Sequence, residues 1–131
     1  MRLVLDADVL IGALDSADGH HTDARALFIQ WQQQDDTRLI SVVNLTEVLI
    51  APSADPRQLR TAREAIGALG VVIHQPTEAL GVDAARLRGQ HPISLPDSFC
   101  LATARHAGGV IASFDRKVRR AAEAEQIALV S

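Results

Sequence analysis

Short apolar segments of three or four residues alternate with longer amphipathic segments along the whole chain. The apolar segments have the length of strands, and the segments between them are long enough for helices. A helix between successive strands is the connection that parallel strands need, so the alternation predicts an α/β fold. We expect a three-layer α/β/α sandwich around a mostly parallel sheet of four to five strands, at 2–5, 39–42, 71–74, 110–113 and 128–130.

The expected helices are marked by capping residues and by glycines. Asp55 is placed to cap a helix whose first position is Pro56, and Gly70 ends that helix. Gly108 and Gly109 stop another. The predicted helical ranges are 9–14, 22–34, 45–50, 56–69, 76–88, 96–106 and 116–125.

Length and composition limit the class of protein. A chain of 131 residues with 47% apolar and 22% charged residues predicts one globular domain over 1–131. Its uninterrupted apolar runs are too short for a membrane span or a signal peptide, so no membrane partner is expected. A single cysteine, Cys100, allows no internal disulfide, and we expect a cytoplasmic protein.

Four acidic residues occur at or near the ends of these elements. Asp6 and Asp115 directly follow apolar strand segments, while Glu47 and Asp97 fall near the expected starts of helices. Parallel strands present their carboxyl ends at one edge of the sheet, and a helix N-terminus stabilises an ionised carboxylate. We therefore expect Asp6, Glu47, Asp97 and Asp115 to meet in one crevice.

A crevice of this kind needs a compensating cation. A carboxylate among core-forming residues destabilises the fold unless its charge is balanced, and these apolar runs contain no matching Lys or Arg. Oxygen-only ligands favour Mg²⁺ or Mn²⁺ over zinc. The five histidines lack metal-ligand spacing and are expected at the surface or in loops. Phe28 and Trp31 are expected in the core or in a dimer contact.

The acidic segments resemble, in order, the motifs of PIN domains, and in particular those of short VapC-type toxins from prokaryotic toxin–antitoxin pairs. The resemblance is carried by Leu3-Val4-Leu5-Asp6-Ala7-Asp8-Val9, Asn44-Leu45-Thr46-Glu47-Val48-Leu49, Leu95-Pro96-Asp97-Ser98 with Ala102-Thr103-Ala104, and Ile111-Ala112-Ser113-Phe114-Asp115-Arg116-Lys117. Three positions depart mildly from the pattern: Asp8 stands where Ser, Thr or Asn is commoner, Ser113 where Thr is common, and Asn44 where Thr or Ser often sits.

The resemblance implies a PIN-like fold and a Mg²⁺- or Mn²⁺-dependent endoribonuclease. Asp6 and Asp97 are the expected direct metal ligands. Asp115 and Glu47 are expected to bind the metal directly or through water, and Glu47 could instead orient the attacking water. Supporting groups are expected at Asp8, Asn44, Thr46 and Ser113, and phosphate contacts at Arg116 and Lys117. The implied partners are RNA, a small cognate antitoxin and a second copy of the chain, with a larger hetero-oligomer containing antitoxin as a further assembly.

Other interpretations remain open at the level of sequence. Asp97 and Asp115 could serve only as helix caps, and Glu47 could be an exposed helical residue. The segment Leu5-Asp6-Ala7-Asp8-Val9 also resembles the first motif of haloacid-dehalogenase-type phosphatases, although Lys117 is the only lysine and no Gly-Asp pair occurs. A phospho-receiver domain and a catalytically inactive PIN-type domain that binds RNA or a partner are the remaining alternatives.

Overall fold

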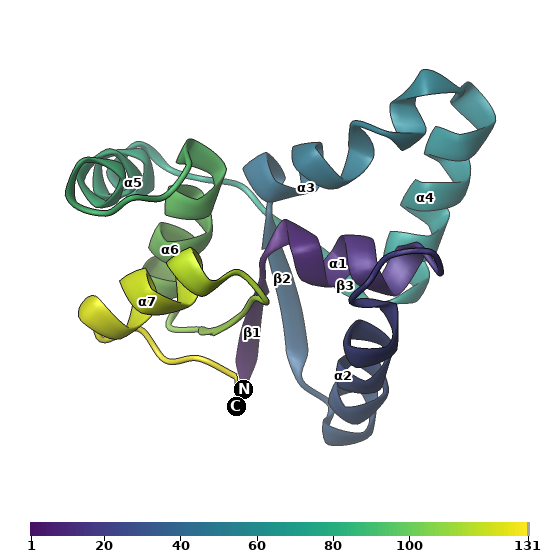
Figure 1. The fold of residues 1–131 in the computed structure, drawn as a ribbon, viewed down its shortest axis with the longest axis horizontal. Helices are drawn as coiled ribbons and strands as arrows, with labels where there is room; N and C mark the ends of the chain where they lie inside the picture. The colour runs from purple at the N-terminus through teal and green to yellow at the C-terminus, as the bar shows by residue number, and fades with distance from the viewer. Residues whose placement is uncertain (131) are drawn as a thin grey trace.

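A four-stranded parallel sheet forms the centre of the computed structural model, which describes residues 1–130 (Figure 1). The strands are β1 (Arg2–Leu5), β2 (Thr37–Ser41), β3 (Val71–His74) and β4 (Val110–Ala112), in the order β3-β2-β1-β4. Val4 of β1 pairs with Leu39 on one side and with Ile111 on the other. The prediction of a parallel sheet is confirmed.

Within residues 1–130, seven α-helices and one short 3₁₀ helix accompany the strands. They are α1 (Ala7–Leu14), α2 (His21–Gln34), α3 (Val42–Leu49), η1 (Pro52–Ala54), α4 (Pro56–Ala68), α5 (Glu78–Gln90), α6 (Leu95–Ala107) and α7 (Arg116–Ala124). In Figure 1, α5, α6 and α7 lie on one side of the sheet and α1, α2 and α4 on the other, which gives the three predicted layers. Within residues 1–130, no helix combines the length and apolarity that crossing a bilayer requires.

Alternate residues of β1 belong to different cores, as the two-residue period of a strand requires. Val4 packs with residues of α5, α6 and α7, whereas Leu3 and Leu5 pack with residues of α1, α2 and α3. Trp31 and Phe28 belong to the second core, with their rings 5.1 Å apart in an edge arrangement. Trp31 is 2% exposed, so it is a core residue and not a surface for RNA.

Most predicted boundaries agree with the structure to within about two residues, and the largest differences occur at two places. The expected closing strand at 128–130 is reduced to a single parallel bridge between Leu129 and Ile111. Helix α3 begins at Val42, three positions before the expected start, because Ser41 caps it by accepting a hydrogen bond from the Val43 amide at 3.2 Å. Glu47 is therefore the sixth residue of α3, and its predicted place near a helix start is wrong.

Candidate active site

The carboxyl edge of the sheet contains one acidic cavity of about 410 Å³. It is lined by Asp6, Ala7, Asp8, Ile11, Glu47, Ile50, Ala51, Asp97 and Asp115. The fold thus brings together the four acidic residues predicted to meet, and adds Asp8 as a fifth carboxylate. These residues come from β1, α1, α3, α6 and the β4–α7 connection, which are far apart in the sequence.

Asp6 lies at the base of the cavity and is 4% exposed. Its Oδ1 accepts a hydrogen bond from the Ala7 amide at 2.8 Å, which caps α1, and its Oδ2 accepts one from the Ser113 hydroxyl at 2.7 Å. Burial, together with repulsion from Asp8 and Asp97, raises the pKa of Asp6 to about 7 despite these two hydrogen bonds. The ionised form of Asp6 is therefore under-compensated by the protein's own groups.

Asp8 contributes a carboxylate oxygen without a partner. Its Oδ2 accepts a hydrogen bond from the Phe114 amide at 3.0 Å, while Oδ1 is buried and has no hydrogen bond. Burial raises the pKa of Asp8 to about 6, and Asp115 adds to the rise; the Phe114 hydrogen bond and the charge of His20 lower it. A buried, unpaired oxygen beside four other carboxylates is the kind of donor that a cation can use.

Asp97 and Asp115 cap helices as well as lining the cavity. Asp97 and Ser94 form a reciprocal capping box at the start of α6, with both hydrogen bonds at 3.2 Å. Asp115 caps α7 by accepting a hydrogen bond from the Lys117 amide at 2.8 Å. The capping interpretation is therefore confirmed, but these contacts use Oδ2 of Asp97 and Oδ1 of Asp115, so the second oxygen of each remains for the cavity.

Asn44 fixes Glu47 and joins two helices at the cavity. The side chain of Asn44 is fully buried, and its Nδ2 donates to the Pro96 carbonyl at 3.0 Å and to Glu47 Oε1 at 3.3 Å. Burial raises the pKa of Glu47 and Asp97 adds to the rise, while the Asn44 hydrogen bond lowers it. Asn44 thus holds α3 against α6 and orients the one glutamate of the cavity.

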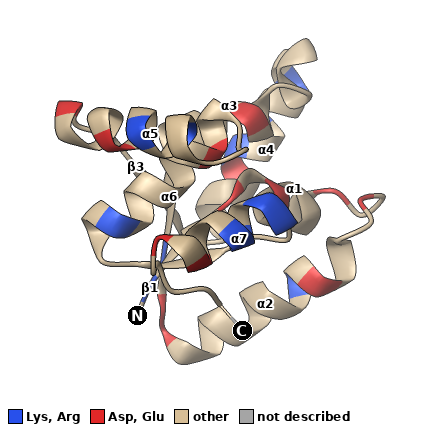
Figure 2. Cartoon of the chain, turned by 60° about the vertical axis from the view of Figure 1, so that its left-hand side comes forward, with Lys and Arg blue, Asp and Glu red and all other residues tan. Residues whose placement is uncertain are grey.

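Three other residues with predicted roles do not line the acidic cavity. Thr46 is exposed and its hydroxyl donates to the Val42 carbonyl at 2.8 Å, within its own helix, so it does not support the acidic cavity. Arg116 and Lys117 are exposed at the start of α7, where the basic residues are blue in Figure 2. Both directly follow Asp115, so the positive charge stands at the border of the cavity.

An aromatic contact at the cavity was not predicted. The His20 ring stacks on the Phe114 ring, with centroids 4.4 Å apart and an interplanar angle of 14°. His20 ends the connection between α1 and α2, and Phe114 lies between Ser113 and Asp115. No local pattern links two residues so far apart in the chain, and the expectation that His20 is a surface residue was correct but incomplete.

The donor set fits a hard divalent cation by its chemistry. Within residues 1–130, no three acidic, histidine or cysteine side chains already converge as metal ligands. Five carboxylates nevertheless line one cavity, three of them with raised pKa values, and Asp8 Oδ1 is unpaired. Small side-chain rotations would offer oxygens to Mg²⁺ or Mn²⁺, which keep several water ligands of their own.

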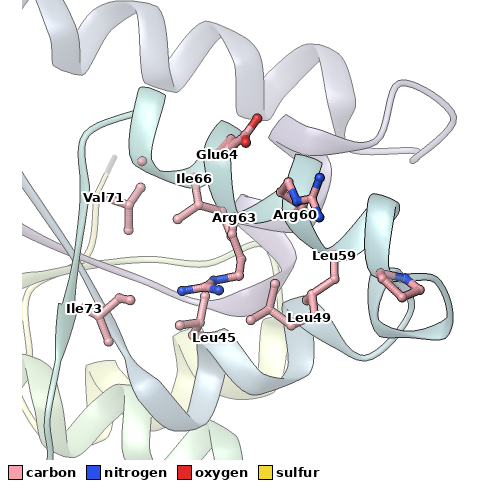
Figure 3. A pocket seen from close by; sticks show the side chains of 11 residues that line it. Leu45, Leu49, Leu59, Arg60, Arg63, Glu64, Ile66, Val71 and Ile73 are labelled. Carbon is pink, nitrogen blue, oxygen red and sulfur yellow. The ribbon is translucent and has the colours of Figure 1, made fainter.

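Two further cavities lie along α4. One, of about 530 Å³, is formed with α3 and β3 and is lined mainly by apolar side chains; Arg63 extends among them towards Leu45 and Ile73, and Arg60 and Glu64 also line it (Figure 3). The other, of about 510 Å³, lies between α1, α3 and α4. The second cavity shares Ile11, Glu47 and Ala51 with the acidic cavity, so the two are adjacent.

Several solved structures share this fold. VapC20 from Mycobacterium tuberculosis, described as a Sarcin-Ricin loop cleaving toxin, aligns with a TM-score of 0.74 and 18% identity over 91% of this chain and 94% of its own. VapBC-1 from nontypeable Haemophilus influenzae aligns with a TM-score of 0.74 and 14% identity over 100% and 98%. A toxin–antitoxin complex from Klebsiella pneumoniae aligns with a TM-score of 0.69 and 22% identity over 88% of both chains.

The sequence itself matches one family. A search of curated protein sequences gave no significant match. The profile of the PIN domain, however, matches residues 3–124 and so includes all five acidic residues of the cavity. Since that match spans most of the chain, this protein belongs to the PIN domain family.

Proposed function

We propose that this PIN domain is a Mg²⁺- or Mn²⁺-dependent endoribonuclease and the toxin of a toxin–antitoxin pair. The observation that carries the proposal is Asp6, a buried carboxylate with a pKa raised to about 7 in a cavity with four other carboxylates. Such a site is destabilised without a cation and becomes a strong ligand set with one. The similarity of the fold to VapC20 and to toxin–antitoxin complexes supports the choice of RNA as substrate.

The acidic residues divide between binding the cation and orienting the attacking water in this proposal. Asp6 and Asp97 hold the cation directly, and Asp115 does so directly or through water. A bound cation supplies positive charge to the scissile phosphate and lowers the pKa of the attacking water. Glu47, held by Asn44, orients that water and accepts its proton, a role that a raised pKa favours.

Residues around the acidic cavity support the ligands and the substrate. Ser113 fixes the orientation of Asp6, and the Phe114 amide fixes that of Asp8, the fifth carboxylate. Arg116 and Lys117 contact phosphates that flank the cleaved bond, where they offset the repulsion between RNA and the carboxylates.

The partner proposal rests on the apolar surfaces beside the acidic cavity. An apolar segment of the antitoxin would occupy the cavity between α1 and α4, which is adjacent to the acidic cavity, and would thereby exclude RNA. A second copy of the chain would cover part of β3, the edge strand on which Val72 and Ile73 are 52% and 45% exposed. A toxin dimer with its antitoxin bound is the resulting hetero-oligomer.

Cleavage of single-stranded RNA tests the proposed activity. The purified protein is incubated with labelled RNA in Mg²⁺ or Mn²⁺, with EDTA as the control. We expect cleavage that requires metal and that falls by at least about 100-fold in Asp6→Asn and Asp97→Asn. Asp55→Asn is the matched control, because Asp55 caps α4 by accepting from the Arg57 amide at 2.9 Å but lies outside the acidic cavity.

The alternatives give different results. A phosphatase would hydrolyse small phosphomonoesters and leave RNA intact, and an inactive binding domain would retain RNA without cutting it. Cleavage that persists in EDTA, or that survives both site substitutions, would exclude the metal-dependent mechanism.

A further inference from the structure

A two-ring stack with one exposed member adjoins Asp8, one of the residues that line the acidic cavity. His20 lies on Phe114 in a nearly parallel arrangement, with ring centroids 4.4 Å apart. Phe114 is half-buried against the apolar core, whereas His20 is exposed. Phe114 covers one face of the imidazole, and His20 as a residue remains exposed.

The stack is joined to the proposed site through the backbone and through charge. The amide of Phe114 donates to Asp8 Oδ2 at 3.0 Å, and the charge of His20 acts on the same carboxylate. Phe114 is also the residue between Ser113, which holds Asp6, and Asp115, which lines the cavity. A group resting on His20 would therefore lie near Asp8 of the acidic cavity.

An RNA nuclease with this surface needs affinity that does not come from charge. The whole chain has a net charge of −3, and five carboxylates face the substrate phosphate, so electrostatic attraction for RNA is weak. Stacking on aromatic side chains is the main uncharged source of affinity for single-stranded bases, and imidazole serves in this role. Among the other rings, Phe28 and Trp31 are buried and Phe99 packs on the core, so none of these can supply it.

We propose that the His20–Phe114 stack is a nucleobase platform, on which a base of single-stranded RNA next to the cleaved phosphodiester rests. This proposal rests on the proposed ribonuclease function and adds a substrate-positioning residue to it. Phe114 orients the imidazole plane, and His20 presents its open face to the base. Stacking is tolerant of base identity, so the platform fixes the position of the chain and not its sequence.

The test measures whether removal of the His20 ring and removal of one RNA base weaken binding independently or through the same contact. Short labelled single-stranded RNAs, each with one abasic nucleotide at a different position, are bound in Ca²⁺ and followed by fluorescence anisotropy, with gels to confirm intact RNA. His20→Ala removes the ring but keeps the Cβ and the backbone contact of His20 with Asp18. His20→Phe restores a stacking ring, Phe114→Leu removes the supporting one, and His106→Ala is the matched loss of an imidazole far from the acidic cavity.

The expected result is specific to stacking. For the parent protein, removing one particular base from the RNA lowers the affinity about 10-fold. For the His20→Ala variant, removing the same base lowers the affinity less than about twofold. His20→Ala itself binds intact RNA about 10-fold more weakly, His20→Phe regains most of that loss, and Phe114→Leu resembles His20→Ala. In Mg²⁺ the loss appears in KM more than in kcat, and His106→Ala behaves as the parent.

The outcomes separate this proposal from the proposed function. Metal-dependent cleavage in which His20→Ala keeps the parent's affinity and dependence on every base overturns the platform and leaves the ribonuclease proposal intact. Coupling between one base and His20 without any cleavage supports the platform and contradicts the ribonuclease. A folded parent that binds no RNA in Ca²⁺ overturns the platform, and its cleavage assay then decides the activity independently.

Discussion

The hydroxyl of Ser113 donates a hydrogen bond of 2.7 Å to Oδ2 of Asp6, across 107 positions of sequence. Both residues directly follow neighbouring parallel strands, β4 and β1, so the sheet register brings them together. The bond favours the ionised form of a carboxylate that burial pushes towards the neutral form. Ser113 therefore controls how readily Asp6 becomes a ligand.

Ser113→Ala is expected to raise the pKa of Asp6 beyond about 7. The loss of one hydrogen bond to a charged oxygen corresponds to a shift of roughly one pH unit. In the pH profile of metal-dependent cleavage, the acidic limb should shift to higher pH by that amount. Ser113→Thr keeps the hydroxyl and should leave the limb at its original pH. An unshifted limb in Ser113→Ala would show that Asp6 does not limit activity at low pH.

Without metal, the protein should lose stability as the pH rises. The pKa of Asp6 is about 7 in the folded protein against an ordinary value of 3.8, so between these pH values the folded state binds more protons than the unfolded state. The free energy of unfolding then falls as pH rises, by about 4 kcal/mol at most for this group. Thermal unfolding in EDTA at pH 5 and pH 8 measures the effect.

The same experiment has an internal control. Asp6→Asn keeps a side chain that caps α1 but cannot ionise, so its unfolding temperature in EDTA should exceed that of the parent at pH 8 and match it more closely at pH 5. Added Mg²⁺ or Mn²⁺ should stabilise the parent at pH 8 and have little effect on Asp6→Asn. A variant that unfolds at lower temperature at both pH values would indicate that Asp6 is mainly structural.

Asn44→Ala should impair both stability and the site. It leaves the Pro96 carbonyl and Glu47 without their hydrogen bonds from the Asn44 amide, which costs about 1–3 kcal/mol in a buried position. It also releases the orientation of Glu47, and loss of a group that supports a ligand lowers metal affinity or activity by about 10- to 100-fold. Chemical denaturation and kcat/KM measured on the same samples, at a temperature where the variant stays folded, separate the two effects.

A polar network far from the acidic cavity should stabilise the fold only above acidic pH. Glu125 at the end of α7 contacts His91 Nε2 at 2.7 Å and Arg105 Nη2 at 2.6 Å, and these hydrogen bonds lower its pKa. A lowered pKa gives stability that is present above the ordinary value of 4.5 and is lost as pH falls through the folded value. Glu125→Gln should therefore reduce the unfolding temperature at pH 7 and have a smaller effect at pH 3, whereas the neighbouring exposed Glu123→Gln should do little at either pH.

Substitutions on α4 test the proposed seat of the antitoxin. Ala62 and Ala65 line the cavity between α1 and α4, so Ala62→Arg or Ala65→Arg would place a long cation where an apolar segment is expected. Inhibition by the cognate antitoxin should weaken by at least about 10-fold while RNA cleavage is retained. Ala85→Arg on the exposed side of α5 provides the control, and equal inhibition of all three variants would place the antitoxin elsewhere.

Sequence reasoning located most of the acidic residues of the cavity because Asp6, Asp97 and Asp115 lie at the ends of elements. Asp6 and Asp115 follow strands that are readable as apolar runs, and parallel strands end at one edge. Glu47 was placed on the wrong turn because Val42 and Val43 have the composition of a strand, whereas the Ser41 cap starts the helix before them. That shift also explains Thr46, whose hydroxyl bonds to the preceding turn of α3.

The remaining features depend on contacts between distant residues. The pairing of His20 with Phe114 joins two connections that the sheet brings together, and neither residue lies in a periodic pattern. The contact of Asn44 with the Pro96 carbonyl depends on how closely α3 approaches α6, which local sequence does not specify. A helix cap and a residue of the cavity are not mutually exclusive roles. Asp6, Asp97 and Asp115 each cap a helix with one oxygen and also line the cavity.

The capping role of these acids has a genetic consequence. Asparagine caps a helix about as well as aspartate does, so an Asp-to-Asn change at position 6 or 115 keeps the helix starts and the surface intact. Under the proposed toxin function, such a change would remove the activity, and a cell carrying this allele beside an intact copy would make an inactive protein that still binds the antitoxin. Less antitoxin would then remain for the intact toxin, so the loss-of-function allele would be dominant and harmful.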